Sequence, residues 1–161
     1  MLEQLELYIN AQKTIANYML AFGILMLLLA LFTHFADSNS TLSGLKMGLI
    51  VFGAFSSVSG LGYKRIEDKL LKSQTLLYQE SSARFQQQET ERMTKVVKNH
   101  PKIQIALIVL VMASLIINLF LDKAFVNGIL FSLVIFSVGN LIIESVSKKS
   151  IDAYFENLSH F

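Results

Sequence analysis

The chain has 161 residues, of which 53% are hydrophobic and 16% are charged. Average soluble chains carry about 45–50% apolar and about 25% charged residues, so this chain is poor in charge. Because it has no cysteine, disulfides, thiolate metal sites and cysteine nucleophiles are excluded. The formal net charge of +2 is too small to indicate a nucleic-acid-binding protein.

Four long apolar stretches decide the class of the protein. They lie at 15–35, 45–61, 103–121 and 125–143. A helix needs about 20 mainly apolar residues to cross a hydrocarbon core of about 30 Å. The residues left over are too few for a separate soluble domain with its own core. The sequence therefore predicts an all-α integral membrane protein with four transmembrane helices arranged as two hairpins.

The chain begins with a short amphipathic segment. Its apolar residues fall on one side of a helix, so residues 1–14 are expected to form a lead-in helix that lies in the membrane interface. Glu3 and Glu6 stand where a secretory signal peptide would be basic, which argues against such a peptide. The first transmembrane hairpin is expected over 15–62.

A polar segment of about 40 residues, 63–102, separates the two expected hairpins. It has no glycine or proline from Tyr63 to His100, which favours a helix. Its two ends must enter the membrane from the same side, so we expect a cytoplasmic helical hairpin that turns near Glu80-Ser81-Ser82. Its apolar stripe is weak, and both a rigid hairpin and a loose, partner-dependent one fit the pattern.

The second transmembrane hairpin is expected over 103–145, with Pro101 in the first turn of its first helix. Residues 146–161 follow as a cytoplasmic amphipathic tail. In it, Ile151, Tyr154, Phe155 and Leu158 share one helical face, which suits contact with the membrane or with the middle segment.

Lysine and arginine are distributed unequally between the two sides of the expected membrane. Only Lys46 and Lys123 lie on the side of the two short outer turns, whereas 12 lie on the side of the termini and the middle segment. Cytoplasmic loops carry the excess of these residues. The sequence therefore places both termini in the cytoplasm of a plasma membrane, of the bacterial inner-membrane type. The 12 residues are Lys13, Lys64, Arg65, Lys69, Lys72, Arg84, Arg92, Lys95, Lys98, Lys102, Lys148 and Lys149.

The two halves of the chain resemble each other weakly. Gly48-Leu49-Ile50 precedes Gly128-Ile129-Leu130 by 80 residues, and Ser57-Val58 precedes Ser137-Val138 by the same offset. Duplication would give parallel repeats related by an axis along the membrane normal. Any two membrane hairpins look alike at this level, so independent origin of the halves stays open.

Small residues recur at a spacing of four in the second apolar stretch, where they allow close approach of helices in lipid. Packing within the chain and self-association between protomers both fit this pattern, and a pore lining is a third possibility. The candidate packing or oligomerisation residues are Gly48, Gly53, Ser56, Ser57 and Gly60.

A polar stripe marks the cytoplasmic half of the fourth stretch: Ser137, Asn140, Glu144 and Ser147 follow one another at helical spacing. Polar side chains at membrane depth normally face protein or water. An interhelical hydrogen bond from Asn140 to Asn118 or to a backbone carbonyl explains the stripe. A hydrated pore in an oligomer, lined by this helix, is the alternative.

The sequence holds no catalytic or cofactor motif. It has no phosphate-binding glycine loop, no nucleophile elbow and no paired carboxylates for acid–base chemistry, so we expect neither enzyme activity nor a cofactor. His34, His100 and His160 are scattered and are interpreted as surface residues rather than metal ligands. The basic pairs Lys64-Arg65 and Lys148-Lys149 follow from topology and also offer contacts for anionic lipids.

These observations predict a non-enzymatic, homo-oligomeric membrane protein that acts through helix–helix contacts in the bilayer and through its cytoplasmic hairpin. A regulatory, scaffold or toxin-immunity role would fit, with membrane lipid and a cytoplasmic or membrane protein as partners. The alternative function is an oligomeric ion channel.

Overall fold

A computed structural model describes residues 1–35 and 39–159 as four long helices with short connections. Every one of the four is long and apolar enough to cross a membrane. This confirms the expected all-α fold with four candidate membrane spans. The helices are α1 (Leu2–Phe32), α2 (Ser40–Glu80), α3 (Ser82–Phe120) and α4 (Ala124–Ser159), and a 3-10 turn, η1 (Thr33–Phe35), follows α1.

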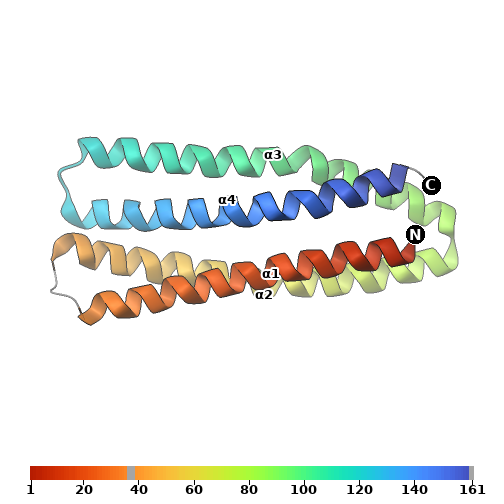
Figure 1. The fold of residues 1–161 in the computed structure, drawn as a ribbon, viewed down its shortest axis with the longest axis horizontal. Coiled ribbons are helices and arrows are strands. Elements are labelled where there is room, and N and C mark those ends of the chain that lie inside the picture. Colours follow the sequence, from red (N-terminus) through yellow and green to blue (C-terminus); the bar gives the residue numbers. More distant parts are fainter. Residues whose placement is uncertain (36–38, 160–161) are drawn as a thin grey trace.

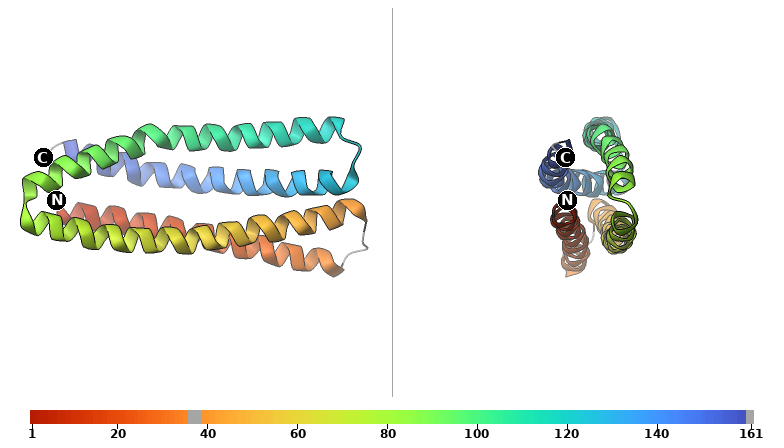
Figure 2. Two further views of the ribbon diagram at one scale, coloured as in Figure 1. Left: turned by 180° about the vertical axis from the view of Figure 1, so that it is seen from behind. Right: turned by 90° about the vertical axis from the view of Figure 1, so that its right-hand side faces the viewer.

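The four helices lie side by side along the long axis of the molecule (Figure 1). Both termini and the α2–α3 connection lie at one end, which we call the termini end. The α1–α2 and α3–α4 connections lie at the other, the loop end. At the termini end, α1 and α4 form one side of the bundle and α2 and α3 form the other (Figure 2). The apolar stretches occupy the half of each helix nearer the loop end.

The two terminal segments are continuous with the long helices α1 and α4. Residues 1–14, expected as a separate lead-in helix in the membrane interface, are the first turns of α1. The tail likewise continues α4 as far as Ser159. Their apolar faces are buried between helices, so they have no need of lipid to cover them. Leu5 and Ile9 from α1 and Leu158 from α4 are each at most 4% exposed.

A hydrophobic core joins all four helices at the termini end, which we call the termini-end core. The rings of Tyr8 and Tyr154 stack at its centre with their centroids 4.6 Å apart. Phe85 is fully buried and meets Tyr78 edge to face. The middle segment is thus packed against both ends of the chain. The buried residues of this core are Leu5, Tyr8, Ile9, Phe85, Met93, Ile151, Tyr154 and Leu158.

One residue, Ser81, separates α2 from α3. Its extended backbone ends α2, and its N–H donates to the carbonyl of Leu77 at 2.9 Å. Its side chain then caps α3 by accepting from the backbone N–H of Arg84 at 3.3 Å. Serine is a favoured N-cap because its hydroxyl satisfies an amide that has no partner inside the helix. The reversal therefore needs neither glycine nor proline.

Pro101 lies inside α3 rather than in the first turn of a separate helix, which corrects the sequence-based expectation. Proline lacks the N–H that would bond to the carbonyl four residues earlier, and it commonly bends a helix. Figure 2 shows α3 changing direction between its polar first part and its apolar second part. Tertiary contacts on either side keep the helix continuous through this point.

Candidate functional site

A buried polar cluster lies where the apolar halves of the helices pass into the polar halves. Gln12 of α1 is fully buried, and its amide nitrogen donates to Ser150 Oγ at 2.8 Å. Its amide oxygen accepts from the hydroxyls of Tyr63 at 3.0 Å and Ser147 at 3.2 Å. One side chain therefore ties α1 to α2 and α4 with hydrogen bonds shielded from water. Such bonds specify one arrangement of the helices, because breaking them leaves buried polar groups without partners.

A second polar group lies inside the termini-end core. Glu89 of α3 is fully buried and accepts two hydrogen bonds from the Arg92 guanidinium, at 2.6 and 2.8 Å. It also accepts one from the Tyr154 hydroxyl of α4 at 3.0 Å. The guanidinium carbon of Arg92 lies 5.4 Å from the centroid of the Tyr8 ring, which adds a cation–π contact. The charged pair is therefore held from three helices.

Burial and neighbouring charges shift the pKa values of Arg92 and Tyr154. Burial alone would lower the pKa of Arg92, but the hydrogen bonds and charge of Glu89 outweigh it and raise that pKa, so the guanidinium stays charged. Burial raises the pKa of the Tyr154 hydroxyl, and the charge of Glu89 raises it further. Tyr154 therefore stays neutral and acts as a donor.

Glu67 of α2 is a buried carboxyl with fewer partners. It is 3% exposed, and its Oε2 forms no hydrogen bond with any part of the chain that the structure describes. Burial raises its pKa, although the charge of Arg92 and the nearby Tyr63 hydroxyl act in the opposite direction. A buried carboxylate with an unpaired oxygen costs stability unless it is protonated.

The histidine interpretation from the sequence is wrong for His100. This residue is 5% exposed, and its Nε2 lies 3.0 Å from Glu144 Oε2 on α4. Its Nδ1 is buried without a hydrogen-bond partner among the described residues. The side chain of His34 and the whole of His160 lie outside the described part of the protein. A lone histidine beside a proline looks like a surface residue in the sequence, because nothing local shows that α4 covers it.

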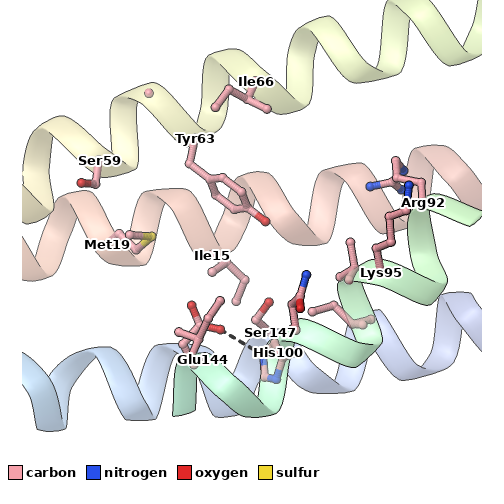
Figure 3. Close-up of a pocket in the computed structure, with 15 residues that line it drawn as sticks. Ile15, Met19, Ser59, Tyr63, Ile66, Arg92, Lys95, His100, Glu144 and Ser147 are labelled. Carbon is pink, nitrogen blue, oxygen red and sulfur yellow. Dashed lines mark ion pairs between the residues drawn. The ribbon is translucent and has the colours of Figure 1, made fainter. Parts of the chain in front are cut away.

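A cavity of about 720 Å³ opens beside this polar cluster. Figure 3 shows residues of all four helices around it, with the His100–Glu144 ion pair on one side. Most of its wall surface is apolar, and the polar residues that line it include Arg92, Lys95, His100 and Glu144. Largely apolar cavities of about 300–1,000 Å³ with a few polar groups are typical of small-molecule sites.

The small residues of α2 pack against the chain's own helices. Ser56 Oγ donates to the carbonyl of Met19 on α1 at 2.9 Å. A Cβ added at Gly53 or Gly60 would lie under 3.0 Å from backbone atoms of α1, and one at Gly48 would overlap Ser132 of α4. Ser57 bonds within α2, to the carbonyl of Gly53. The four on the packing face, Gly48, Gly53, Ser56 and Gly60, are buried in the bundle.

The polar stripe of α4 faces the inside of the bundle. Ser137 is fully buried and Asn140 is 9% exposed. Asn140 donates to the carbonyl of Phe136 in its own helix at 2.8 Å, while Asn118 donates to the carbonyl of Asn127 near the loop end. Asn140 and Asn118, which the sequence suggested as hydrogen-bond partners, therefore donate to different backbone carbonyls and not to each other.

The two basic pairs lie away from the cavity, and all four side chains are exposed. Lys64 approaches the side-chain oxygen of Asn17 at 3.4 Å, and Lys148 pairs with Asp152 at 3.0 Å. Arg65 and Lys149 form no hydrogen bond or ion pair with the bundle interior in the part of the chain that the structure describes. Their positions are those of surface charges.

The sequence analysis did not single out Gln12, Glu67 or Glu89. A signal for Gln12 was present, because it follows Tyr8 and Ile9 at helical spacing and so continues the buried face of α1. Glu89 likewise lies four residues from both Phe85 and Met93, and Glu67 lies four residues from both Tyr63 and Leu71, so helical spacing also places these two carboxyls beside apolar positions. Among the described residues, no group of three or more histidine, aspartate or glutamate side chains is arranged to hold a metal ion. No family model, curated protein or solved structure matches the chain.

Proposed function

We propose that this chain is a non-enzymatic, multi-pass plasma-membrane protein, of the bacterial inner-membrane type, that acts as a rigid helical scaffold for a protein or lipid partner. The loop end faces outward, and the termini end lies in the cytoplasm. In this topology α1 with α2 and α3 with α4 form two transmembrane hairpins, and the polar parts of α2 and α3 form a cytoplasmic hairpin. The 12-to-2 distribution of lysine and arginine supports this orientation.

The observation that carries the scaffold role is the continuity of the helices. All four run unbroken from the apolar half into the polar half, where Gln12 and Glu89 connect them through buried hydrogen bonds. Around the cavity these polar groups are engaged in structural hydrogen bonds, and among the described residues we identify no nucleophile activated by a neighbouring base. A bundle held together in this way is suited to binding a partner and to transmitting helix movements rather than to catalysing a reaction.

The burial of Ser137 and Asn140 inside the chain's own bundle weighs against a pore between protomers. A pore lined by α4 requires these side chains to face a shared axis between protomers, whereas in this chain they are buried. We therefore favour the scaffold over the channel.

Self-association is proposed through α3 rather than through the small residues of α2, which are used within the chain. In the 18 most apolar residues of α3, 11% are buried, compared with 28% to 33% in the other three helices. Its apolar half contacts mainly α4. It therefore presents the largest membrane-facing surface for a second copy.

Cysteine labelling tests the topology directly, because the natural chain has no cysteine. Single cysteines replace Arg84, near the α2–α3 turn, and Lys123, near the α3–α4 turn. A membrane-impermeant maleimide applied to intact cells should label Lys123→Cys alone, and both variants after permeabilisation. Labelling of Arg84→Cys in intact cells would refute the orientation. Recovery of the chain as a water-soluble monomer would refute membrane insertion itself.

Liposome flux and native mass separate the scaffold from the channel. The purified protein should conduct no ions after reconstitution, and Asn140→Leu should leave that result unchanged. Ion flux that Asn140→Leu alters would support the channel. A dimeric or larger mass that Ile108→Trp, on the exposed face of α3, abolishes would support the α3 contact; a mass unchanged by it would refute that contact.

A further inference from the structure

The cavity described above opens sideways, between α2 and α3. Its floor is formed by α1 and α4, where Ile15, Ser147 and Ile151 are each at most 5% exposed. Its rim is formed by exposed residues, among them Ile66 of α2 and Lys95 of α3. An opening between two helices, rather than at the end of the bundle, admits a molecule from the surrounding membrane.

The rim is open at one glycine in particular. A Cβ added to Gly62 would have no atom within 4 Å, in contrast to Gly60, which lies two residues away and packs on α1. The space in front of Gly62 is therefore part of the entrance. A side chain can be placed there without pushing a helix.

The polarity of the cavity changes along its length. Met19, Ser59 and Ile103 line the part that lies within the apolar stretches, and aliphatic side chains dominate there. Arg92 and Lys95 line the part that lies in the polar middle segment. Because Glu89 already neutralises Arg92, the unbalanced charge at this end is that of Lys95, which forms no ion pair within the described chain.

His100 lies between these two parts of the cavity. The residue lines the cavity, but its ring is buried, and its Nδ1 is shielded from solvent and has no partner among the described residues. Buried polar nitrogens are rarely left unpaired in folded proteins. Glu144 lies beside Nε2, so Nδ1 is the ring nitrogen left for a ligand that enters the cavity.

We propose that this cavity binds an anionic glycerophospholipid of the cytoplasmic leaflet, with an acyl chain among Ile15, Met19 and Ile103 and the phosphate beside Lys95 and His100. The direction of the polarity matches a lipid of that leaflet, whose chains point to the bilayer centre and whose headgroup points to the cytoplasm. The inference rests on the proposed membrane orientation and supplies the lipid partner of the scaffold. It is distinct from surface attraction at Lys64, Arg65, Lys148 and Lys149, which do not line the cavity.

The test is a lipid titration of the purified full-length protein in detergent, followed by native mass spectrometry. The probes are phosphatidylglycerol and phosphatidylcholine with identical chains, together with inorganic phosphate as a competitor. One phosphatidylglycerol per chain should bind more tightly than phosphatidylcholine, and inorganic phosphate should not displace it. Equal binding of the two lipids would show unspecific lipid association, and displacement by phosphate would show a simple anion site; either would overturn the proposal.

Two pairs of variants connect binding to the cavity. Gly62→Trp fills the entrance and should weaken phosphatidylglycerol binding by about tenfold or more, whereas Gly62→Ala should bind like the natural chain. Lys95→Gln should lower the preference for the anionic lipid by about fivefold. Lys98→Gln removes an equivalent exposed charge that does not line the cavity, and it should leave the preference unchanged.

Circular dichroism verifies that each variant is folded, and Ile66→Trp replaces Gly62→Trp as the occluding variant if the latter fails to fold. If both folded tryptophan variants bind the lipid like the natural chain, the assignment to this cavity is refuted. The titration in detergent does not depend on orientation. Its failure is therefore distinguishable from a failure of the topology, which the cysteine labelling tests separately.

Discussion

One methyl group added to Gly60 tests the packing of α2 against α1, and the same group added to Gly62 is the matched control. Replacing glycine by alanine inside a helix stabilises it by about 0.5–1 kcal/mol, because the backbone loses less freedom on folding. At Gly62 the new Cβ meets no atom within 4 Å. Gly62→Ala should therefore raise the free energy of unfolding by this full amount.

At Gly60 the same change meets backbone atoms of the neighbouring helix. The new Cβ would lie 2.7 Å from the carbonyl oxygen of Ala16 and 2.8 Å from the amide nitrogen of Leu20, so α1 must move away. Overpacking of this kind costs about 1–3 kcal/mol. Because the gain in helix propensity is common to both variants, Gly60→Ala should be less stable than Gly62→Ala by about 1–3 kcal/mol.

The assay is denaturant unfolding of the purified protein in detergent, followed by far-ultraviolet circular dichroism, with native mass measured in parallel. Equal free energies of unfolding for the two variants would refute the packing of Gly60 on α1. A Gly60→Ala protein of normal stability that loses a dimeric mass would show that this face packs between protomers instead.

Three further predictions concern the buried polar groups. Gln12→Leu should destabilise the protein by about 2 kcal/mol, and adding Tyr63→Phe should recover part of that loss because the orphaned hydroxyl is removed; additive losses in a double-mutant cycle would contradict the bond between them. Tyr154→Phe should cost about 1.5–3 kcal/mol, since it removes a hydrogen bond to the charged Glu89, and an unchanged free energy of unfolding would argue that the bond is absent. Burial raises the pKa of Glu67, so its protonated form is favoured in the folded protein, and stability should be fullest below the ordinary pKa of 4.5 and fall as the pH rises through the raised value. Glu67→Gln should remove this decline, so the variant should be more stable than the natural protein at neutral pH but not at acidic pH. If the difference in free energy of unfolding between the two proteins did not depend on pH, this reasoning would be wrong.

The helices themselves were largely predictable from the sequence. Apolar length identified four spans, and the break at Ser81 lies where a turn was expected, because a capping serine follows a long run of helix formers. The extents of α1 and α4 were not predicted. Periodicity shows that residues 1–14 and 146–159 each have an apolar face, but it does not show whether lipid or another helix covers that face.

The candidate site was less predictable for the same reason. Ser147 and Gln12 are 135 positions apart in the chain, and the contact between them follows only from the packing of α1 beside α4. Sequence reasoning left packing within the chain as one of three possibilities for Gly53 and Gly60, which lie against α1 in the structure. It misjudged His100, because the residue that pairs with it, Glu144, belongs to a distant helix.

The absence of a break in α1 between its apolar and polar parts has a mechanical consequence. A helix of 31 residues is about 46 Å long at 1.5 Å per residue. When a thinner bilayer tilts it by about 10° around its loop end, simple trigonometry moves Met1 sideways by about 8 Å. In the proposed orientation, a change in bilayer thickness would therefore become a sideways displacement of the termini end.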